Sequence, residues 1–478
     1  MNTKIDVYNT LIRYYPKQNN SFAQNLVDYS MESNLKIKNF GPIIDVDIKL
    51  KNVNVFIGPQ ASGKSVLAKI YTIFKAPRKF FFDKGIENNS EIEIKEKEFQ
   101  DVLEEYNIKS FLKADTEIEF DSVLHFMSYK NGKLSYTPKL RQKIEVIKNQ
   151  SSDFDLYRNT IVNSFKELIG NFIVFNLRAA QLLIKFGEPF KLAPENIDKV
   201  DEITCLELIN IIEDIEEDLS KNAALYIPAE RNLSNIVKKS ALNLIINKVP
   251  IPKHILSFGA ELEKIEVDEI DLGFLHESLK YKTVNNEDVI YSGEHVAIKL
   301  HEAASGIQSV VPVLVPILHR KEVMNHRSFV IEEPELNLFP TAQYNLIQLL
   351  ESNRNESYWE DWGTIHTYTT HSPYVLSALN NLLYAGGLIT KLNHSDVTKG
   401  IYNNYLEANK ANEQEVHKIV KATISPISFT AYQINEGSAM SIFNDDTGLI
   451  DDNYIDESSD TINEDFEALM ELANDRGI

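Results

Sequence analysis

Residues 58–65 read Gly58-Pro59-Gln60-Ala61-Ser62-Gly63-Lys64-Ser65, and the segments on either side of this loop are regular. Before it, Asn52–Ile57 is short, apolar and rich in β-branched and aromatic residues, which predicts a buried strand. After it, from Val66 to Phe74, apolar side chains recur with a helical period. A strand, a loop of the pattern G-x-x-x-x-G-K-S and a helix, in that order, indicate a loop that binds the phosphates of a nucleoside triphosphate.

The residue types of this loop suit that chemistry. Its glycines let backbone N–H groups approach phosphate oxygens closely, and the start of the helix adds a partial positive charge. Lys64 is placed to reach the β- and γ-phosphates, and the Ser65 hydroxyl to join a Mg²⁺ ion. The pattern also arises by chance in surface loops, but the strand and the helix around it argue against that. We therefore predict that all eight residues bind ATP together with Mg²⁺.

Composition bounds the classes of protein that fit. With 478 residues, the chain has room for two or three domains, and 43% hydrophobic and 25% charged residues are ordinary for a globular protein. No run of eighteen apolar residues predicts a membrane span, and residues 1–30 lack the apolar segment of a signal peptide. The single cysteine, Cys205, excludes an intramolecular disulfide framework and fits a small buried side chain. We expect a cytoplasmic protein without a membrane partner.

The net charge of −21 bears on partners. Proteins that wrap nucleic acid usually carry a basic surface, because neutralised phosphates supply most of the affinity. Much of the excess charge lies at the C-terminal end, where about a dozen Asp and Glu fall between Asp445 and Asp475. The charge lowers the expectation of direct nucleic acid binding without excluding one basic face. An acidic end of this kind also suits a basic partner protein.

The pattern along the chain predicts five parts. Residues 1–33 form a lead-in, 34–139 an N-terminal lobe with the phosphate loop, 140–222 a helical insertion, 223–400 a C-terminal lobe and 401–478 an acidic C-terminal region. Within them, 35–50 predicts a hairpin beside the strand before the phosphate loop, and Asn131-Gly132 predicts a second hairpin. Residues 279–300 are β-rich, 429–443 predict a further hairpin, and 462–472 an acidic amphipathic helix.

Two further segments carry chemistry. Ser328–Ile331 predicts a buried strand that ends in Glu332-Glu333-Pro334-Glu335, at the strand end where open α/β sheets bind ligands. Since successive strand residues face opposite ways, Glu332 can serve Mg²⁺ through water while Glu333 polarises the attacking water. A solvated acidic turn is the alternative for this stretch.

Thr364–Thr370 predicts another strand, and it ends in His371-Ser372-Pro373. A histidine at a strand end, followed by a proline that opens a helix, can hydrogen-bond a terminal phosphate. The plain alternative is a core histidine with satisfied hydrogen bonds.

In this order the motifs resemble a known family. The loop 58–65, Ala304-Ser305-Gly306-Ile307-Gln308-Ser309, Phe329 to Leu336 and Thr370-His371-Ser372-Pro373 resemble ABC-type AAA ATPase heads of the RecF/SMC/OLD-like branch. Within that branch the chain resembles the stand-alone ATPase subunits of bacterial anti-phage systems such as Septu and PARIS. The likeness covers roughly residues 34–80 and 224–390. It implies an α/β P-loop head, with a mixed sheet, flanking helices and an antiparallel β subdomain, here carrying the helical insertion.

The resemblance also implies roles. Ser305, Gly306 and Gln308 correspond to the signature motif, which in this family reaches the γ-phosphate bound by a second subunit, although Ile307 stands where a second glycine is usual. Glu332 replaces the more common Asp on the metal side, and His371 corresponds to the switch histidine. The stretch 227–231 (Ile-Pro-Ala-Glu-Arg) recurs in these ATPases and receives no role, while Gln100 is one candidate for the glutamine loop.

Three functions are compared. The first is an ATPase that dimerises around ATP and regulates or scaffolds a protein effector, such as a nuclease encoded nearby, in anti-phage defence. The second is a DNA-repair or DNA-tethering ATPase that binds duplex directly. A transporter subunit fits the helical insertion poorly. The acids after Asp445 read as acidic surface, with a metal-binding nuclease site as the minority alternative.

Overall fold

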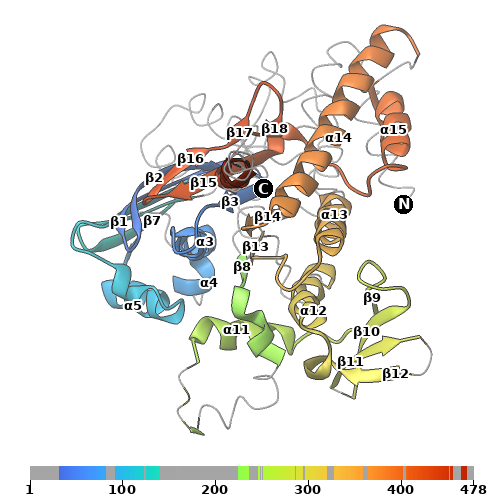
Figure 1. The fold of residues 1–478 in the computed structure, drawn as a ribbon. Coiled ribbons are helices and arrows are strands. Elements are labelled where there is room, and N and C mark those ends of the chain that lie inside the picture. Colours follow the sequence, from blue (N-terminus) through green and yellow to red (C-terminus); the bar gives the residue numbers. More distant parts are fainter. Residues whose placement is uncertain are drawn as a thin grey trace.

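A computed structural model gives the fold (Figure 1). It describes residues 32–81, 92–122, 125–139, 159, 224–235, 246, 247, 249, 251–285, 287–293, 296–319, 328–358, 364–401, 405–451, 453–455 and 464–470. Residues 1–31 of the predicted lead-in 1–33, nearly all of the predicted helical insertion 140–222, and Cys205 lie outside these residues. Of the predicted helix 462–472, residues 464–470 are described, and they are helical and exposed.

The described elements are groups of strands separated by α-helices. The strands are β1 (Ser33–Phe40), β2 (Ile43–Leu50), β3 (Val53–Ile57), β4 (Ile92–Ile94), β5 (Glu117–Ser122), β6 (His125–Lys130), β7 (Lys133–Pro138), β8 (Ala224–Ile227), β9 (Ile270–Asp271), β10 (Leu279–Val284), β11 (Glu287–Ser292), β12 (Val296–Lys299), β13 (Ser328–Glu332), β14 (Ile365–Thr369), β15 (Phe429–Asn435), β16 (Ser438–Ser441), β17 (Phe443–Asn444) and β18 (Leu449–Ile450). The α-helices are α3 (Lys64–Lys75), α4 (Pro77–Phe81), α5 (Glu96–Glu105), α11 (Lys253–Leu262), α12 (Ser305–Leu318), α13 (Pro340–Tyr358), α14 (Pro373–Thr398) and α15 (Tyr405–Val416).

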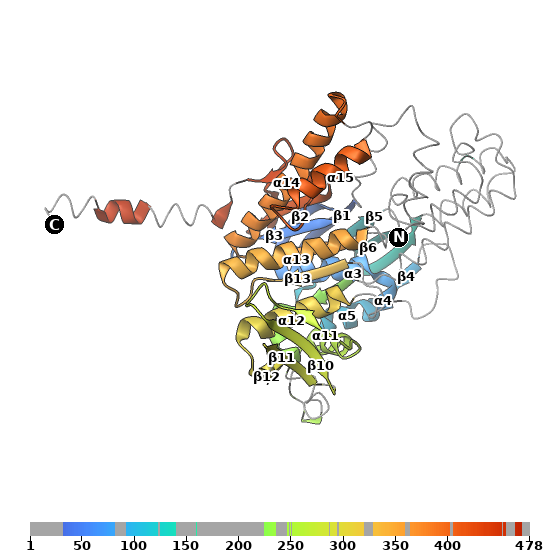
Figure 2. The ribbon, with the colours of Figure 1, turned by 90° about the vertical axis from the view of Figure 1, so that its right-hand side faces the viewer.

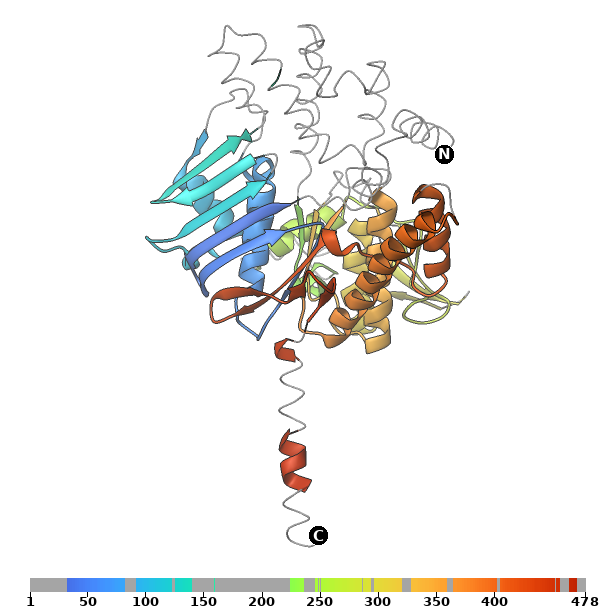
Figure 3. The same ribbon diagram turned by 90° about the horizontal axis from the view of Figure 1, so that it is seen from above.

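One large mixed sheet dominates the described fold. Its twelve strands lie in the order β4-β7-β6-β5-β1-β2-β16-β15-β3-β14-β13-β8. The strands from β15 to β8 run parallel, whereas β4, β7, β6, β5, β1 and β2 pair antiparallel (Figure 3). The α/β class, the mixed sheet and the flanking helices predicted from sequence are thereby confirmed.

Strand β3 explains why the sequence before the phosphate loop is apolar throughout. Val53, Val55 and Ile57 pack into a core with helices α12, α13 and α14, whereas Phe56 packs into a second core with α3 and α5. All five residues of the strand are buried. A parallel strand covered on both faces shows a continuous apolar run rather than an alternating one.

The first hairpin does not lie beside the phosphate-loop strand. β1 and β2 form the expected antiparallel pair, but β2 is separated from β3 by β16 and β15. The two intervening strands come from the C-terminal region, and β15 pairs in parallel with the whole of β3. The placement predicted for the hairpin was therefore wrong, because a parallel partner nearly 400 residues away in the chain leaves no local signal.

The remaining predicted strands and hairpins are found where the sequence indicates them. Asn131-Gly132 joins β6 to β7, and β15 and β16 form the hairpin predicted at 429–443. The β-rich segment 279–300 forms β10, β11 and β12, which with β9 make a separate four-stranded antiparallel sheet below α12 in Figure 1. The charge-rich stretch 91–105 contains helix α5, which buries Phe99, Val102 and Leu103 and is therefore amphipathic.

Helices cover both faces of the parallel half. Figure 2 shows α13 and α14 stacked over this part of the sheet, with α12 leading down to the small sheet. Helix α3 packs on the opposite face, with Phe74 and Tyr71 in the second core. Among the described residues, no helix is long and apolar enough to cross a membrane.

Candidate functional site

The loop 58–65 follows the C-terminal end of β3 and turns directly into α3. Gly58, Ala61 and Gly63 have positive φ angles of 149°, 62° and 109°, a backbone region that favours glycine. A Cβ on Gly58 would lie 2.1 Å from the Ile434 carbonyl oxygen of β15. The loop conformation therefore depends both on its own glycines and on the C-terminal strand beside it.

Lys64 is folded back into the loop. Its Nζ donates to the carbonyl oxygens of Gly58 and Pro59, each at 2.8 Å, and lies 3.4 Å from Ser62 Oγ. Burial lowers the pKa of Lys64 to about 8, against the opposing effect of the nearby carboxylates, of which Glu333 is the first. The ammonium group is thus charged at neutral pH. Its hydrogen bonds to Gly58, Pro59 and Ser62 all end on oxygen atoms, and phosphate oxygens can take the place of these acceptors.

The outer side of the loop is open. Pro59, Gln60, Ala61 and Ser65 are exposed, and Ser65 lies in the first turn of α3. The first N–H groups of a helix have no partner within it, so the start of α3 presents donors and a partial positive charge. This arrangement suits the phosphates of a nucleotide.

Glu332 and Glu333 stand two strands away on the same sheet edge, because β3, β14 and β13 run parallel in that order. Glu332 is buried, and its Oε2 accepts the Ala229 N–H at 3.3 Å. Its Oε1 is buried and has no hydrogen-bond partner in the part of the chain that the structure describes. A buried carboxylate oxygen without a partner, together with the exposed Ser65 hydroxyl, fits a Mg²⁺ ion that keeps water and phosphate oxygens as its other ligands.

Glu333, the first residue after β13, is less buried than Glu332. Its backbone has a left-handed φ of 42°, its N–H donates to the Thr369 carbonyl at 2.9 Å, and its side chain is one-third exposed. Oε1 lies 3.7 Å from His371 Nε2. The two neighbouring carboxylates therefore differ in environment; since β13 ends at Glu332 and Glu333 has a left-handed backbone, strand alternation does not account for the difference.

Glu335 was quoted in the sequence motif without a role, and the structure supplies contacts for it. Its Oε1 accepts Thr370 Oγ1 at 2.6 Å and the His371 N–H at 3.0 Å. Burial raises the pKa of this carboxyl. Glu335 thus ties the turn after β13 to the end of β14 and fixes the backbone of His371.

His371 follows β14 and is not a fully buried core residue. About a third of its side chain is exposed, and its ring lies between Glu333 and Tyr454, whose hydroxyl is 3.2 Å from Nδ1. Burial and the nearby Lys64 ammonium lower the pKa of His371, which favours the neutral imidazole. Ser372 accepts the N–H groups of Tyr374 and Val375 and caps α14, the helix that Pro373 opens.

Arg231 lies next to the candidate site, and the sequence pattern gave no indication of the hydrogen bonds that it makes there. The guanidinium is fully buried and donates to the carbonyl oxygens of Glu332 at 2.7 Å and Glu333 at 2.8 Å. It also donates to Ser309 at 2.7 Å and Pro228 at 3.2 Å. Burial lowers the pKa of Arg231 to about 10, so it stays charged. The stretch 227–231, noted only as a recurring motif, thus joins the backbone of Glu332 and Glu333 to helix α12.

The segment Ser305–Gln308 forms the first turn of α12. Ser305 is exposed, whereas a Cβ on Gly306 would lie 2.7 Å from the Asn337 carbonyl oxygen in the turn after β13. Gln308 Nε2 donates to the Ala303 carbonyl at 2.7 Å, which holds the start of its own helix. Within the described chain, these residues contact the carboxylate turn, and Asn337 completes the link by donating to Ser309 Oγ at 2.9 Å.

The candidate residue for the glutamine loop lies away from the phosphate loop. Gln100 is on α5, where its amide donates to Glu96 on the same helix at 3.0 Å.

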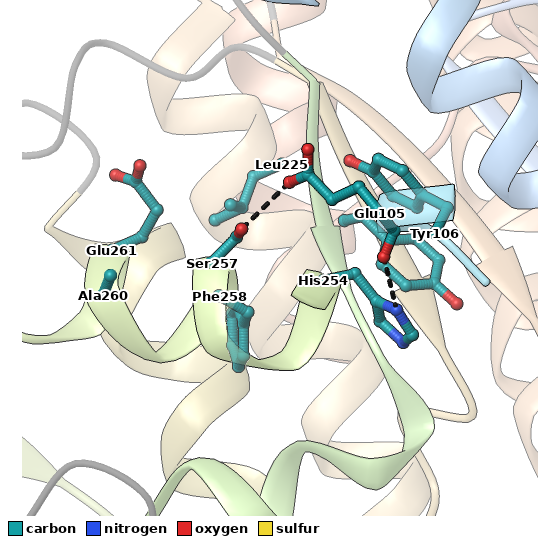
Figure 4. Close-up of a pocket in the computed structure, with 9 residues that line it drawn as sticks. Glu105, Tyr106, Leu225, His254, Ser257, Phe258, Ala260 and Glu261 are labelled. Carbon is teal, nitrogen blue, oxygen red and sulfur yellow. Dashed lines mark hydrogen bonds between the residues drawn. The ribbon is translucent and has the colours of Figure 1, made fainter. Parts of the chain in front are cut away.

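A cavity of about 250 Å³ lies between α5, β8 and α11, lined by His254, Ser257 and Glu105 among others (Figure 4). There Ser257 donates to Glu105 at 2.9 Å, and the His254 ring stacks on Tyr106 with ring centroids 6.0 Å apart.

The structure gives no support to the less favoured alternative for the C-terminal region, a metal-binding nuclease site formed by the acids after Asp445. Among the residues described, no group of three or more His, Cys, Asp or Glu side chains is arranged to hold a metal ion. Asp445 and Asp451 belong to this described part, whereas Asp452 and the acids of 456–463 and 471–478 lie outside it.

Comparisons with known proteins place the chain in a family. The family profile described as AAA ATPase domain matches residues 31–376. No curated protein matches the chain. Similar solved structures include the SMC head domain from Thermotoga maritima, 13% identical, covering 73% of this chain and 92% of that one at a TM-score of 0.31. Another is an ATP-binding cassette of an ABC transporter in its ADP conformation, 13% identical, covering 87% and 93% at a TM-score of 0.30.

Proposed function

The chain belongs to the family of AAA ATPase domains, and from that premise we propose that it binds ATP with Mg²⁺ at residues 58–65 and hydrolyses it as an ABC-type head. The observation that supports this most is the shared sheet edge. The phosphate loop ends β3, His371 follows β14 and the two glutamates end β13, so three adjacent parallel strands deliver all of them to one side. Ligands bind at this edge in open α/β sheets.

The residues divide the work. Lys64 exchanges the carbonyl oxygens of Gly58 and Pro59 for β- and γ-phosphate oxygens. Ser65 and, through water, Glu332 would hold the Mg²⁺ ion that accompanies the nucleotide. Bound Mg²⁺ neutralises charge that develops on the phosphates. Glu333 orients the attacking water and His371 contacts the terminal phosphate. The 3.7 Å between Glu333 Oε1 and His371 Nε2 leaves the two groups near enough to act on one phosphate.

The second step of the proposal is a dimer around ATP. Ser305 is exposed at the first turn of α12, and this turn is tied to Glu333 through Arg231 and Ser309. A second chain's nucleotide seated on Ser305, Gly306 and Gln308 would therefore be sensed at the carboxylates. We expect Ser305→Arg to lower the activity of wild-type chains in mixed samples, measured as turnover against mixing ratio. Full turnover by a strictly monomeric wild type, followed by light scattering, would contradict the dimer.

The third step concerns the client. The net charge of −21 and the acidic end favour a protein partner, in keeping with an ATPase that controls an effector such as a nuclease in anti-phage defence in the cytoplasm. Clusters of basic residues are sparse in the sequence: the candidates are Lys238-Lys239 with Lys248 and Lys253, and the group Lys75, Arg78 and Lys79. Direct binding of duplex DNA is the competing proposal, and Lys238-Lys239 is its main basic candidate.

Hydrolysis is tested with Glu333→Gln, which keeps size and hydrogen bonding while removing the charge. Phosphate release from ATP in Mg²⁺ should fall by roughly 100-fold or more. Glu415→Gln, a substitution on the exposed end of α15, is the control and should leave turnover unchanged. Wild-type turnover in Glu333→Gln would overturn the assignment.

The client is tested by two measurements on the full chain and on a chain that ends at residue 455. Labelled duplex is titrated at low and physiological salt, with and without ATP. Tight, salt-sensitive binding that stimulates hydrolysis would favour the DNA-tethering proposal. Weak binding, together with loss of a co-purifying effector when residues 456–478 are removed, would favour the effector proposal. Truncation at 455 preserves β15 to β18, which belong to the fold.

A further inference from the structure

The chain after β18 returns to the sheet edge that carries the candidate site. β17 and β18 pair with each other, and β18 packs against α14, the helix that begins two residues after His371 (Figure 1). Asn380 of α14 fixes this approach, because its side chain accepts the Ile450 N–H at 2.7 Å and donates to the Ile450 carbonyl at 3.1 Å. Residues 453–455 therefore have a defined place relative to His371.

Residues 453–455 are also attached to the strand beside the phosphate loop. The Tyr454 N–H donates to Gln433 Oε1 at 3.0 Å, and Gln433 of β15 lies in register with Ile57, the residue before Gly58. Asn453 is buried and its Oδ1 accepts the Ile455 N–H at 3.2 Å, which closes a short turn around Tyr454. Tyr454 and Ile455 pack against the core shared by β3 and α14.

This attachment places the Tyr454 hydroxyl 3.2 Å from His371 Nδ1. The opposite nitrogen of the same ring, Nε2, lies 3.7 Å from Glu333 Oε1. A histidine whose Nδ1 is hydrogen-bonded has its ring orientation fixed by that partner. The backbone of Gly58 also acts on the Tyr454 hydroxyl, opposing the rise in pKa that burial causes.

We propose that Tyr454 is a positioning residue of the nucleotide site, which orients the His371 ring so that Nε2 faces Glu333 and the terminal phosphate. The proposal rests on the proposed ATP hydrolysis. It makes the C-terminal region a part of the site: β15 supports Gly58, and Tyr454 sets the histidine. It also explains why residues 449–451 and 453–455 are held by α14 and β15 rather than continuing as acidic surface.

Tyr454→Phe tests the role, because it removes the hydroxyl and keeps the ring. We expect kcat to fall roughly tenfold, the size typical of partners that orient a functional side chain, with KM for ATP within about twofold of the wild type. Tyr432→Phe is the matched control. Tyr432 lies on β15 and its hydroxyl also makes two hydrogen bonds, to the N–H and the carbonyl of Lys49, away from His371.

A double-mutant cycle separates positioning from packing. If Tyr454 acts through His371, adding Tyr454→Phe to His371→Gln produces no further loss of kcat. In ¹⁵N-labelled protein, the ring signals that disappear in His371→Gln should shift in Tyr454→Phe and stay in place in Tyr432→Phe.

The outcomes distinguish the two proposals. A wild-type chain that hydrolyses no ATP overturns the proposed function and this role with it. A wild-type chain that hydrolyses ATP, with Tyr454→Phe equal to Tyr432→Phe in kcat and in the His371 ring signals, overturns only the role of Tyr454. Additive losses in the double variant also overturn it, because they place the effect of Tyr454 outside His371.

Discussion

The phosphate loop and the carboxylate edge face each other but are built in different ways. The loop is eight consecutive residues, and its lysine is held by carbonyl oxygens five and six residues away in the chain. The carboxylate edge brings together Arg231, residues 332–335, His371 and Tyr454, so its contacts span more than 200 residues. The first is local chemistry that a motif can carry, and the second exists only once the sheet has formed.

The difference also appears in burial. The loop exposes Pro59, Gln60, Ala61 and Ser65, whereas Arg231 is fully buried, Glu332 nearly so and Glu335 partly. Buried charged groups must be paired or hydrogen-bonded, and removing one partner leaves the others unsatisfied. Substitutions in the loop should therefore act on binding and turnover, while those at the carboxylate edge should act on folding as well.

The largest effect is expected from Lys64→Ala. The Lys64 ammonium is the group that exchanges its contacts with the loop carbonyl oxygens for contacts with phosphate oxygens. Its loss should lower turnover by roughly 100-fold or more. Lys69→Ala is the matched control on the same helix. Lys69 lies 5.7 Å from the Tyr226 ring centroid, so its loss should cost about 1 kcal/mol of stability at most. Equal turnover in the Lys64→Ala and Lys69→Ala variants would contradict the role of the loop lysine in binding the phosphates.

Arg231→Met should show the cost of the carboxylate edge in both stability and activity. Four carbonyl oxygens lose their donor, so the free energy of unfolding should fall by about 3 kcal/mol or more, measured by urea denaturation. Turnover below the unfolding transition should fall as well, because the backbone of Glu333 loses its support.

Arg354→Met is the comparison for that variant. Arg354 is also buried and lies 2.5 Å from Glu351, but on α13 within a cluster with His366. It should lose stability by a similar amount and retain the wild-type turnover of its folded fraction. If Arg231→Met behaves in the same way, the link from Arg231 to catalysis is wrong.

Gly306→Ala gives a smaller, steric effect. The added Cβ would lie 2.7 Å from the Asn337 carbonyl oxygen, and the turn after β13 must shift, at a cost of roughly 1–3 kcal/mol. Gly387→Ala in α14 meets its nearest atom at 3.6 Å and should stabilise the helix by about 0.5–1 kcal/mol. Thermal unfolding of the two variants measures the difference, and a shift of the same sign in both would contradict the close packing of α12.

The smallest effect is the pH dependence of two histidines. Burial lowers the pKa of His254, with Lys69 adding to it, and burial and Lys64 lower that of His371. The fold thus favours the neutral rings, so their contribution to stability is present above about pH 6.5 and is lost as pH falls through the lowered values. Replacing both by Gln should reduce the fall in unfolding temperature between pH 7.5 and 5.5.

Sequence patterns predict those parts that depend on neighbouring residues. The strand before Gly58, the hairpins at Asn131-Gly132 and Asn435-Glu436-Gly437, and the strand that ends at Glu332 all follow from local periodicity and turn chemistry. The position of β15 beside β3 and the four acceptors of Arg231 do not, because parallel pairing and buried hydrogen bonds leave no periodic trace. The same reason hid Tyr454 within a region that reads as acidic surface.

The central claim is that the phosphate loop binds ATP and that Glu333 at the facing edge supports its hydrolysis. Equilibrium binding of ATP in the presence of Mg²⁺ to wild type, Lys64→Ala and Glu333→Gln, with phosphate release measured on the same preparations, tests it most directly. The account predicts that Lys64→Ala loses ATP binding. Glu333→Gln should bind ATP within about threefold of the wild type, and its turnover should be lower by roughly 100-fold or more. Retained binding by Lys64→Ala, or undiminished turnover by Glu333→Gln, would contradict it.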